Sequence, residues 1–181
     1  MSESNAAEDA VRYPVGRDRP CAQVTSQDRE QWLDQLAELP EKLKEAVAGL
    51  SDTQLDTPYR AGGWTARQVV HHLADSHMHS YMRFRHAVTE DAPVIKVYDE
   101  ARWAELSDAK TAPVGLSVGL LGQLHARWIL FLRGFGDAEY ARVFRHPERG
   151  DLRLDTALGL YAWHGRHHVA QIMGLRKRNG W

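Results

Sequence analysis

The spacing of apolar and polar residues along the chain predicts long amphipathic helices. Apolar residues recur three and four positions apart in the first of these helices and again in the third, the period of an α-helix with one buried face. The second begins with Thr65 and Gln68, which match a capping box, where each side chain satisfies a free backbone N–H of the other residue. The four predicted helices are 27–49, 66–89, 117–133 and 156–179.

Four long helices without a strong strand pattern predict an all-α fold, a four-helix bundle. Ser26 is the expected N-cap of the first helix, and Pro40 means that this helix either kinks or restarts with proline at its first position. Gly180 suits the end of the last helix, because glycine accepts left-handed backbone angles. The buried stripe predicted for the third helix consists of Leu120, Leu121, Leu124, Trp128 and Phe131.

The segments between these helices are short, with one exception. The stretch 93–113 is long and irregular, with a short helix expected at 99–106, and a connection of that length is often functional. A single turn is expected at 52–55, and a small hairpin at 143–154 precedes the last helix. Residues 1–12 are polar and expected to fray, and 13–20 to form an extended arm. The predicted organisation is an N-terminal arm, 1–20, partly disordered, and a single bundle domain, 21–181.

Composition and charge narrow the functional classes. A chain of 181 residues suits one domain, and 23 basic against 24 acidic residues give no electrostatic footprint for nucleic acid. No apolar run approaches the roughly 20 residues that span a bilayer, and no signal peptide is recognisable. The single cysteine, Cys21, cannot form an internal disulfide, which suits a reducing compartment. A soluble cytoplasmic protein is expected, with neither a nucleic acid nor a membrane as partner.

Histidines stand out, because the chain has ten of them and eight fall in two clusters, 71–86 and 164–168. Imidazole is the commonest metal ligand. His164 and His168 are four residues apart, so they lie on one face of a helix and can present nitrogens to one ion; His164 and His167, three apart, could also do so. A catalytic zinc site uses three protein ligands and one open position.

The third ligand would come from the helix at 66–89. His72 lies near Val69 and Leu73, on the side expected to face the bundle interior, whereas His71 points about 100° away. A lone histidine on a half-apolar face is more often a hydrogen-bonded core or surface residue. By spacing alone, the metal interpretation and this structural one are about equally supported.

Two separate segments resemble a known signature. Gly62-Gly63-Trp64-Thr65-Ala66-Arg67-Gln68-Val69-Val70-His71-His72-Leu73-Ala74-Asp75-Ser76-His77 and Tyr161-Ala162-Trp163-His164-Gly165-Arg166-His167-His168 resemble the DinB/YfiT-like superfamily, in particular its YfiT group. That group is labelled as metal-dependent hydrolases, and some members act as bacillithiol S-transferases. The resemblance implies a four-helix bundle whose second and fourth long helices hold one divalent ion, zinc or alternatively nickel. It places the ligands on His72, His164 and His168, and it implies a homodimer.

Three neutral imidazoles leave the charge of a divalent ion uncompensated, so its open position favours an anion. Bound water would be acidified toward a pKa of about 7, and a bound thiol would be deprotonated outright. Because no carboxylate stands beside the ligands in the sequence, we favour transfer of a low-molecular-weight thiol, with bacillithiol as co-substrate, to small electrophiles. The alternatives are a hydrolase using metal-bound water and a non-catalytic metal-binding stress protein.

Two further side chains are weak catalytic candidates. Asp75 lies three residues after His72 and is expected either to accept an imidazole N–H or to form a salt bridge with Arg67 or Arg83. His167 would act as a proton shuttle or be solvated, and the solvated interpretation is preferred. The aromatic residues that would wall a pocket, or else belong to the core, are Trp64, Trp103 and Trp163.

Overall fold

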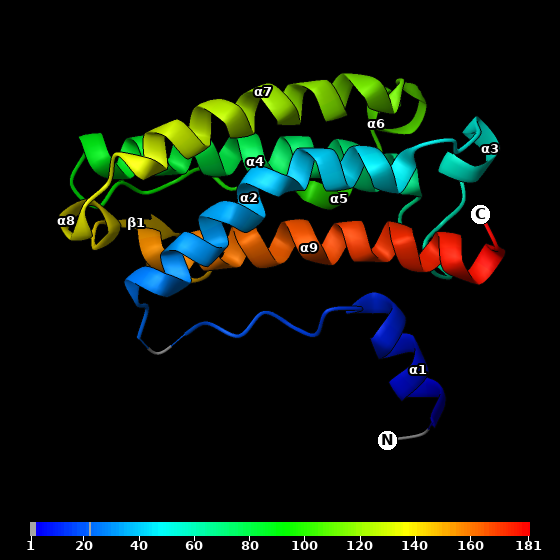
Figure 1. The fold of residues 1–181 in the computed structure, drawn as a ribbon, viewed down its shortest axis with the longest axis horizontal. Helices are drawn as coiled ribbons and strands as arrows, with labels where there is room; N and C mark the ends of the chain where they lie inside the picture. Colours follow the sequence, from blue (N-terminus) through cyan, green and yellow to red (C-terminus); the bar gives the residue numbers. More distant parts are fainter. Residues whose placement is uncertain (1–2, 22) are drawn as a thin grey trace.

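The computed structural model describes residues 3–21 and 23–181 and confirms the predicted four-helix bundle. The bundle consists of α2 (Ser26–Val47), α4 (Ala66–Thr89), α7 (Val114–Arg133) and α9 (Leu154–Asn179), shown in Figure 1. α4 has the predicted bounds, and its start is the one that the capping box indicated. α7 begins three residues earlier than predicted and α9 two residues earlier.

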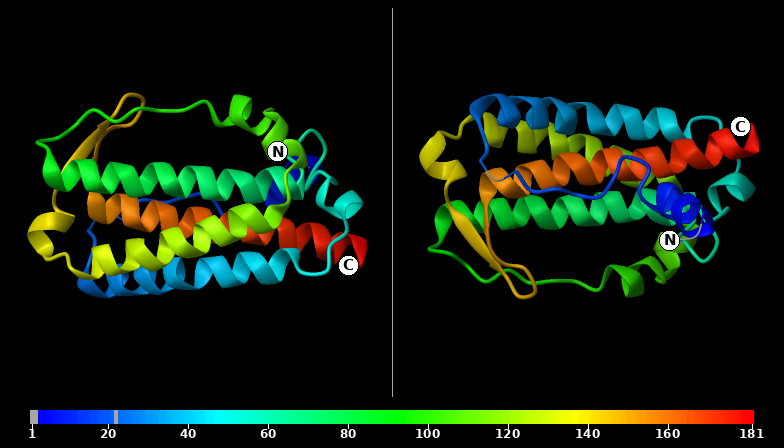
Figure 2. Two further views of the ribbon diagram at one scale, coloured as in Figure 1. Left: turned by 90° about the horizontal axis from the view of Figure 1, so that it is seen from above. Right: turned by 90° about the horizontal axis from the view of Figure 1, so that it is seen from below.

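The order of the helices around the bundle explains the long connection. α2 packs against α7 and α9, and α4 packs against the same two helices, so α2 lies diagonally opposite α4. α4 and α7 run in the same direction as neighbours (Figures 1 and 2). The chain must therefore return along the whole length of α4, about 36 Å for its 24 residues.

The connection carries two short helices and is tied to the hairpin. α5 (Glu100–Ala104) lies within the range where one short helix was expected, and a second short helix that was not predicted, α6 (Ser107–Thr111), follows it. β1 (Val143–His146) and β2 (Gly150–Arg153) form the predicted hairpin as an antiparallel pair. The Ile95 N–H donates to the carbonyl of Arg145 at 3.0 Å. Figure 2 shows the connection and the hairpin along one side of the bundle, where they wall the cleft described below.

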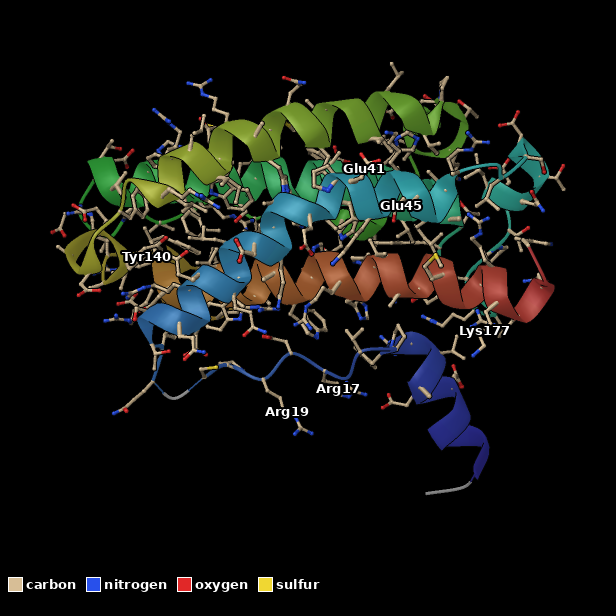
Figure 3. The ribbon with its side chains drawn as sticks, in the orientation of Figure 1. Arg17, Arg19, Glu41, Glu45, Tyr140 and Lys177 are labelled. Carbon is tan, nitrogen blue, oxygen red and sulfur yellow. The ribbon has the colours of Figure 1, made fainter. Side chains whose placement is uncertain are left out.

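The N-terminal segment contains a helix that its polar sequence did not predict. Residues 3–12 form α1 (Glu3–Arg12), and the disorder expected for the N-terminal arm stays a prediction. Val11 packs against the core, a tertiary contact that the local sequence does not reveal. The arm that follows runs along α9 as expected (Figure 1), and the Trp163 indole donates to the Gly16 carbonyl at 3.0 Å. Arg19 on this arm points away from the bundle (Figure 3).

Two expectations about α2 concerned its N-cap and the effect of Pro40. Its N-cap is Thr25 rather than Ser26, because Thr25 forms a reciprocal capping box with Asp28. The helix continues through Pro40 without interruption, so the alternative in which it restarts at this proline is wrong. Two short helices complete the fold, α3 (Asp52–Leu55), at the predicted single turn, and α8 (Asp137–Tyr140) before the hairpin.

The buried stripe of α7 differs from the predicted one. It consists of Leu121, His125, Trp128 and Leu132, whereas Leu120 is 48% exposed. The stripe includes a histidine, which a search for apolar residues passes over. By length and composition alone, α7 could also cross a membrane, which we did not expect from the sequence; here it packs against α2 and α4.

Candidate metal centre

Three histidines from two antiparallel neighbours, α4 and α9, meet at the middle of the bundle. The ligand atoms of His72, His164 and His168 all lie within 4.8 Å of one another. Nε2 of His72 is 3.2 Å from Nε2 of His164. His164 and His168 are brought together by one turn of α9, as predicted. The contact of His164 with His72 depends on the packing of α9 against α4, because His72 lies on α4.

The separation of one pair of these nitrogens matches the ligand spacing of a tetrahedral metal ion. With metal–nitrogen bonds of about 2.0–2.1 Å, two ligands of a tetrahedral ion lie roughly 3.3 Å apart. The separation of 3.2 Å between His72 and His164 is close to that value. Among the side chains described, those of residues 8–21 and 23–181, no other group of three or more histidine, cysteine or acidic residues has this spacing.

Burial keeps the three imidazoles in the form that binds a cation. Desolvation lowers the pKa of His72 to about 4, with a smaller contribution from His167. Desolvation also lowers the pKa of His164 and of His168 well below the usual value, and neighbouring imidazoles add to the effect. All three rings are therefore neutral at pH 7, with a lone pair available for a metal ion.

Buried side chains hold the second nitrogen of two of these rings. Nδ1 of His164 lies 3.2 Å from Nε2 of His77, and Nδ1 of His77 lies 2.9 Å from Nε2 of His125. Nδ1 of His125 lies 2.6 Å from the carbonyl oxygen of Leu36. His77, 0% exposed, and His125, 1% exposed, come from α4 and α7. Sequence analysis missed both roles, since His125 showed no spacing to the other histidines.

The second ring nitrogen of His168 contacts a different side chain, Gln171. Nδ1 of His168 lies 2.8 Å from Oε1 of Gln171. Nε2 of Gln171 donates to the carbonyl of Arg12, at 2.9 Å, which connects the site to α1. Gln171 lies three residues after His168 on α9, and this spacing was the one available signal for its role.

A cleft of about 690 Å³ opens beside the three histidines. Its walls come from α4, α9, the long connection and the hairpin. Trp64 and Trp163 line it, which is one of the two alternatives that the sequence left open. Trp103 instead packs against His79 and Tyr98. At another part of the cleft, Nη1 of Arg83 donates to the Tyr161 hydroxyl at 3.1 Å. The acidic lining residues are Asp99, Glu100 and Glu148.

Neither expected role of Asp75 is found in the described part of the chain. Asp75 forms no hydrogen bond there with a histidine: the second nitrogens of His164 and His168 contact His77 and Gln171 instead, and Nδ1 of His72 has no partner. The expected salt bridge is also wrong, since Arg67 pairs with Asp52 and Asp56. Burial, with a smaller contribution from Asp108, raises the pKa of Asp75 to about 6.

The preferred interpretation of His167 as a solvated side chain is wrong. The residue is 6% exposed, its ring stacks on Trp163 with centroids 4.7 Å apart, and its Nε2 accepts from Gln171 at 2.9 Å. His71 points away from the ligands, as expected, and its ring contacts Ser117 and the carbonyl of Ala112.

Comparisons with known proteins agree with this fold. The family model of the DinB superfamily matches residues 26–172. A Bacillus subtilis (strain 168) protein named "Putative metal-dependent hydrolase YfiT" is 50% identical over 172 residues, which are 94% of this chain and 97% of that protein. A similarly named protein of Bacillus mycoides is 48% identical over 171 residues, 94% of this chain and 98% of the relative.

Solved structures give the same result. The structure described as "YfiT from Bacillus subtilis is a probable metal-dependent hydrolase with an unusual four-helix bundle topology" superposes with a TM-score of 0.93 at 49% identity, covering 95% of this chain and 99% of that one. A four-helix bundle protein, TT2238, shares the fold alone, with a TM-score of 0.55 at 20% identity over 78% of this chain and 94% of that one. The family match, the full-length relatives and the superposed structure together show that this chain belongs to the DinB superfamily.

Proposed function

We propose that this protein is a metal-dependent enzyme that holds one divalent ion per chain with His72, His164 and His168. The observation that carries the proposal is the spacing of three neutral, mostly buried ring nitrogens at the edge of a cleft. Relatives about half identical over nearly the whole chain are named metal-dependent hydrolases, which supports the same class. Zinc is the ion we expect first, because it takes three histidine ligands and an open position, and nickel is the alternative.

Such an ion supplies a nucleophile at neutral pH by lowering the pKa of a water or a thiol in its open position. The chain's own residues would bind the ion and orient the substrate. The neutral imidazoles add no negative charge, and the ligand group contains no carboxylate among the described residues. A thiol needs no carboxylate base to become reactive there, so we propose thiol transfer to a small electrophile, with a bacillithiol-type thiol as co-substrate. The protein would act in the cytoplasm, where such thiols are kept reduced.

Hydrolysis is the second candidate, and two observations favour it. The relatives are named as hydrolases, and acidic side chains such as Glu148 and Asp99 line the same cleft, where they could take a proton from water. A non-catalytic metal-binding protein is the third candidate, and the assays below separate it from both.

One feature of the cleft indicates the charge of the substrate. Arg83 forms no salt bridge within the described residues, although it lines the cleft. Its Nε is buried and without a hydrogen-bond partner there, while Tyr161 fixes the orientation of the guanidinium. A partly buried guanidinium without a carboxylate is suited to an anionic group. We therefore expect a substrate with a carboxylate or phosphate some distance from its reacting atom.

Elemental analysis of the purified protein tests the metal site. We expect about one ion per chain in the parent protein and a strong loss in His168→Ala. The control is His86→Ala on α4, because His86 is exposed and contacts Glu90 rather than the three ligands. Equal occupancy in the parent and in His168→Ala would refute the ligand assignment.

Parallel assays with zinc-loaded protein test the reaction. One measures disappearance of free bacillithiol with monochlorobimane, in which the sulfur bonds to carbon and chloride leaves with the bonding electrons. The other measures acid release from ester and amide substrates. Conjugation without acid release supports thiol transfer, acid release without thiol supports hydrolysis, and tight metal binding without either reaction supports the non-catalytic protein.

A further inference from the structure

Two of the three proposed ligands are each linked to a backbone carbonyl through buried side chains. One chain of contacts runs from His164 through His77 and His125 to the carbonyl of Leu36. The other runs from His168 through Gln171 to the carbonyl of Arg12. A carbonyl oxygen can only accept a hydrogen bond, so each chain has one end at which the direction of donation is fixed.

The first chain can be followed outward from Leu36. Nδ1 of His125 must carry the hydrogen, because it faces the carbonyl oxygen at 2.6 Å. In a neutral ring, Nε2 of His125 is then an acceptor, so Nδ1 of His77 donates to it at 2.9 Å. Nε2 of His77 is consequently an acceptor as well, and Nδ1 of His164 donates to it at 3.2 Å. Nε2 of His164 is left with a lone pair, 3.2 Å from Nε2 of His72.

The second chain gives the same result for His168. The atom of Gln171 that faces the Arg12 carbonyl must be the amide nitrogen, so the amide oxygen faces His168. Nδ1 of His168 therefore carries the hydrogen and donates at 2.8 Å. The remaining nitrogen, Nε2, keeps its lone pair for an ion.

The hydrogen bonds of the first chain of contacts keep this direction of donation only while the rings of His77 and His125 are neutral. An extra proton on His77 would make both of its nitrogens donors, and His164 would then carry its hydrogen on Nε2, where a metal would have to bind. Burial opposes this state, because His77 is 0% and His125 is 1% exposed and a buried ring loses the hydration that would stabilise its charge. His72 differs, since its Nδ1 has no hydrogen-bond partner among the described residues.

We propose that His77, His125 and Gln171 are positioning residues that set the Nδ1–H tautomer of His164 and His168 before any ion binds. Their role in metal binding rests on the function proposed above, whereas the tautomer belongs to the metal-free protein. A ligand held in its binding tautomer and orientation needs no rearrangement when the ion arrives, and such outer contacts typically contribute about 10–100-fold to metal affinity. His72 would be the ligand that adjusts on binding.

The tautomers can be measured directly in the metal-free parent protein. Long-range ¹H–¹⁵N correlation spectra of ¹⁵N-labelled histidine distinguish a protonated Nδ1 from a protonated Nε2. We expect His164, His168, His77 and His125 all to be neutral with the hydrogen on Nδ1 at pH 7. A hydrogen on Nε2 of His164 or His168 would overturn the proposal, whether or not the protein binds a metal.

Metal affinity tests the consequence, measured by competition for Zn²⁺ with a chromophoric chelator. His77→Phe keeps an aromatic ring but removes the acceptor, so we expect it to bind Zn²⁺ about 10–100-fold more weakly. His77→Gln supplies an acceptor oxygen and a donor amide, and we expect it to recover most of the loss. The control is His71→Phe, because His71 is a buried histidine on the same helix that does not contact the ligands.

A second pair of variants covers the case in which His77→Phe does not fold. Gln171→Leu removes the acceptor for His168, and Gln171→Glu retains one, so zinc affinity should fall in the first and recover in the second. Affinities of His77→Phe and Gln171→Leu within twofold of the parent would overturn the proposal. A parent protein that binds no zinc would refute the proposed function, while the spectra would still decide the tautomers.

Discussion

Mild acid should destabilise this protein because it contains buried neutral histidines, and His125 gives the clearest case. Its side chain lies between α2 and α7, 1% exposed, with Nδ1 donating to the Leu36 carbonyl at 2.6 Å. Desolvation lowers its pKa from 6.5 to about 4. The unfolded chain therefore takes up a proton below pH 6.5 that the folded protein does not accept.

The sign and size of the effect follow from proton linkage. Between pH 6.5 and 4, the unfolded state binds more protons at this site, so the free energy of unfolding falls as the pH falls. One such group changes it by about 1.4 kcal/mol per pH unit, or roughly 3 kcal/mol over the whole interval. The contribution is fully present above pH 6.5. The pKa values of His77, His164 and His168 are lowered as well. The free energy of unfolding of the parent should therefore fall by more than the contribution of His125 alone.

Urea unfolding at pH 4.5, 5.5, 6.5 and 7.5, with EDTA to remove metal, measures this dependence. We compare the parent with His125→Gln, because glutamine offers a donor and an acceptor but no ionisable group. Between pH 4.5 and 6, the variant's free energy of unfolding should fall less steeply with acid, by about 1.4 kcal/mol per pH unit. His86→Gln, at an exposed site, provides the control substitution. Parallel curves for the parent and His125→Gln would refute the reasoning.

Three further predictions concern packing, substrate binding and assembly. A Cβ on Gly165 would lie 2.5 Å from Cδ2 of the buried Leu39. Gly165→Ala should therefore destabilise the protein by about 1 kcal/mol, because overpacking costs roughly 1–3 kcal/mol and the higher helix propensity of alanine offsets about 1 kcal/mol of that cost. An increase in the urea midpoint would contradict this prediction. Arg83→Gln should raise KM for an anionic substrate by about tenfold or more and leave kcat little changed, because a hydrogen bond to a charged group contributes roughly 1.5–3 kcal/mol. KM for the neutral methyl ester of the same substrate should not change. The homodimer remains a prediction, and sedimentation equilibrium should give twice the chain mass of 20.5 kDa.

The sequence by itself determined the helices and the identity of the proposed ligands. The Thr65–Gln68 capping box fixed the start of α4, because that signal involves residues three apart. The four-residue spacing of His164 and His168 likewise placed two imidazoles on one face of α9. The choice of His72 needed the family resemblance as well, because five histidines lie between 71 and 86 and periodicity alone gave it even odds.

The tertiary structure decided which residues from distant parts of the chain meet. His125 contacts His77 across 48 residues, and Gln171 contacts Arg12 across 159. Such contacts depend on which helices are neighbours, and here α4 and α7 pack in parallel because a long connection returns the chain along the bundle. The same packing excludes water from His77 and His167, which sets their neutral state. Local spacing encodes what lies within a few turns of one helix, whereas burial and contacts between helices are properties of the packed bundle.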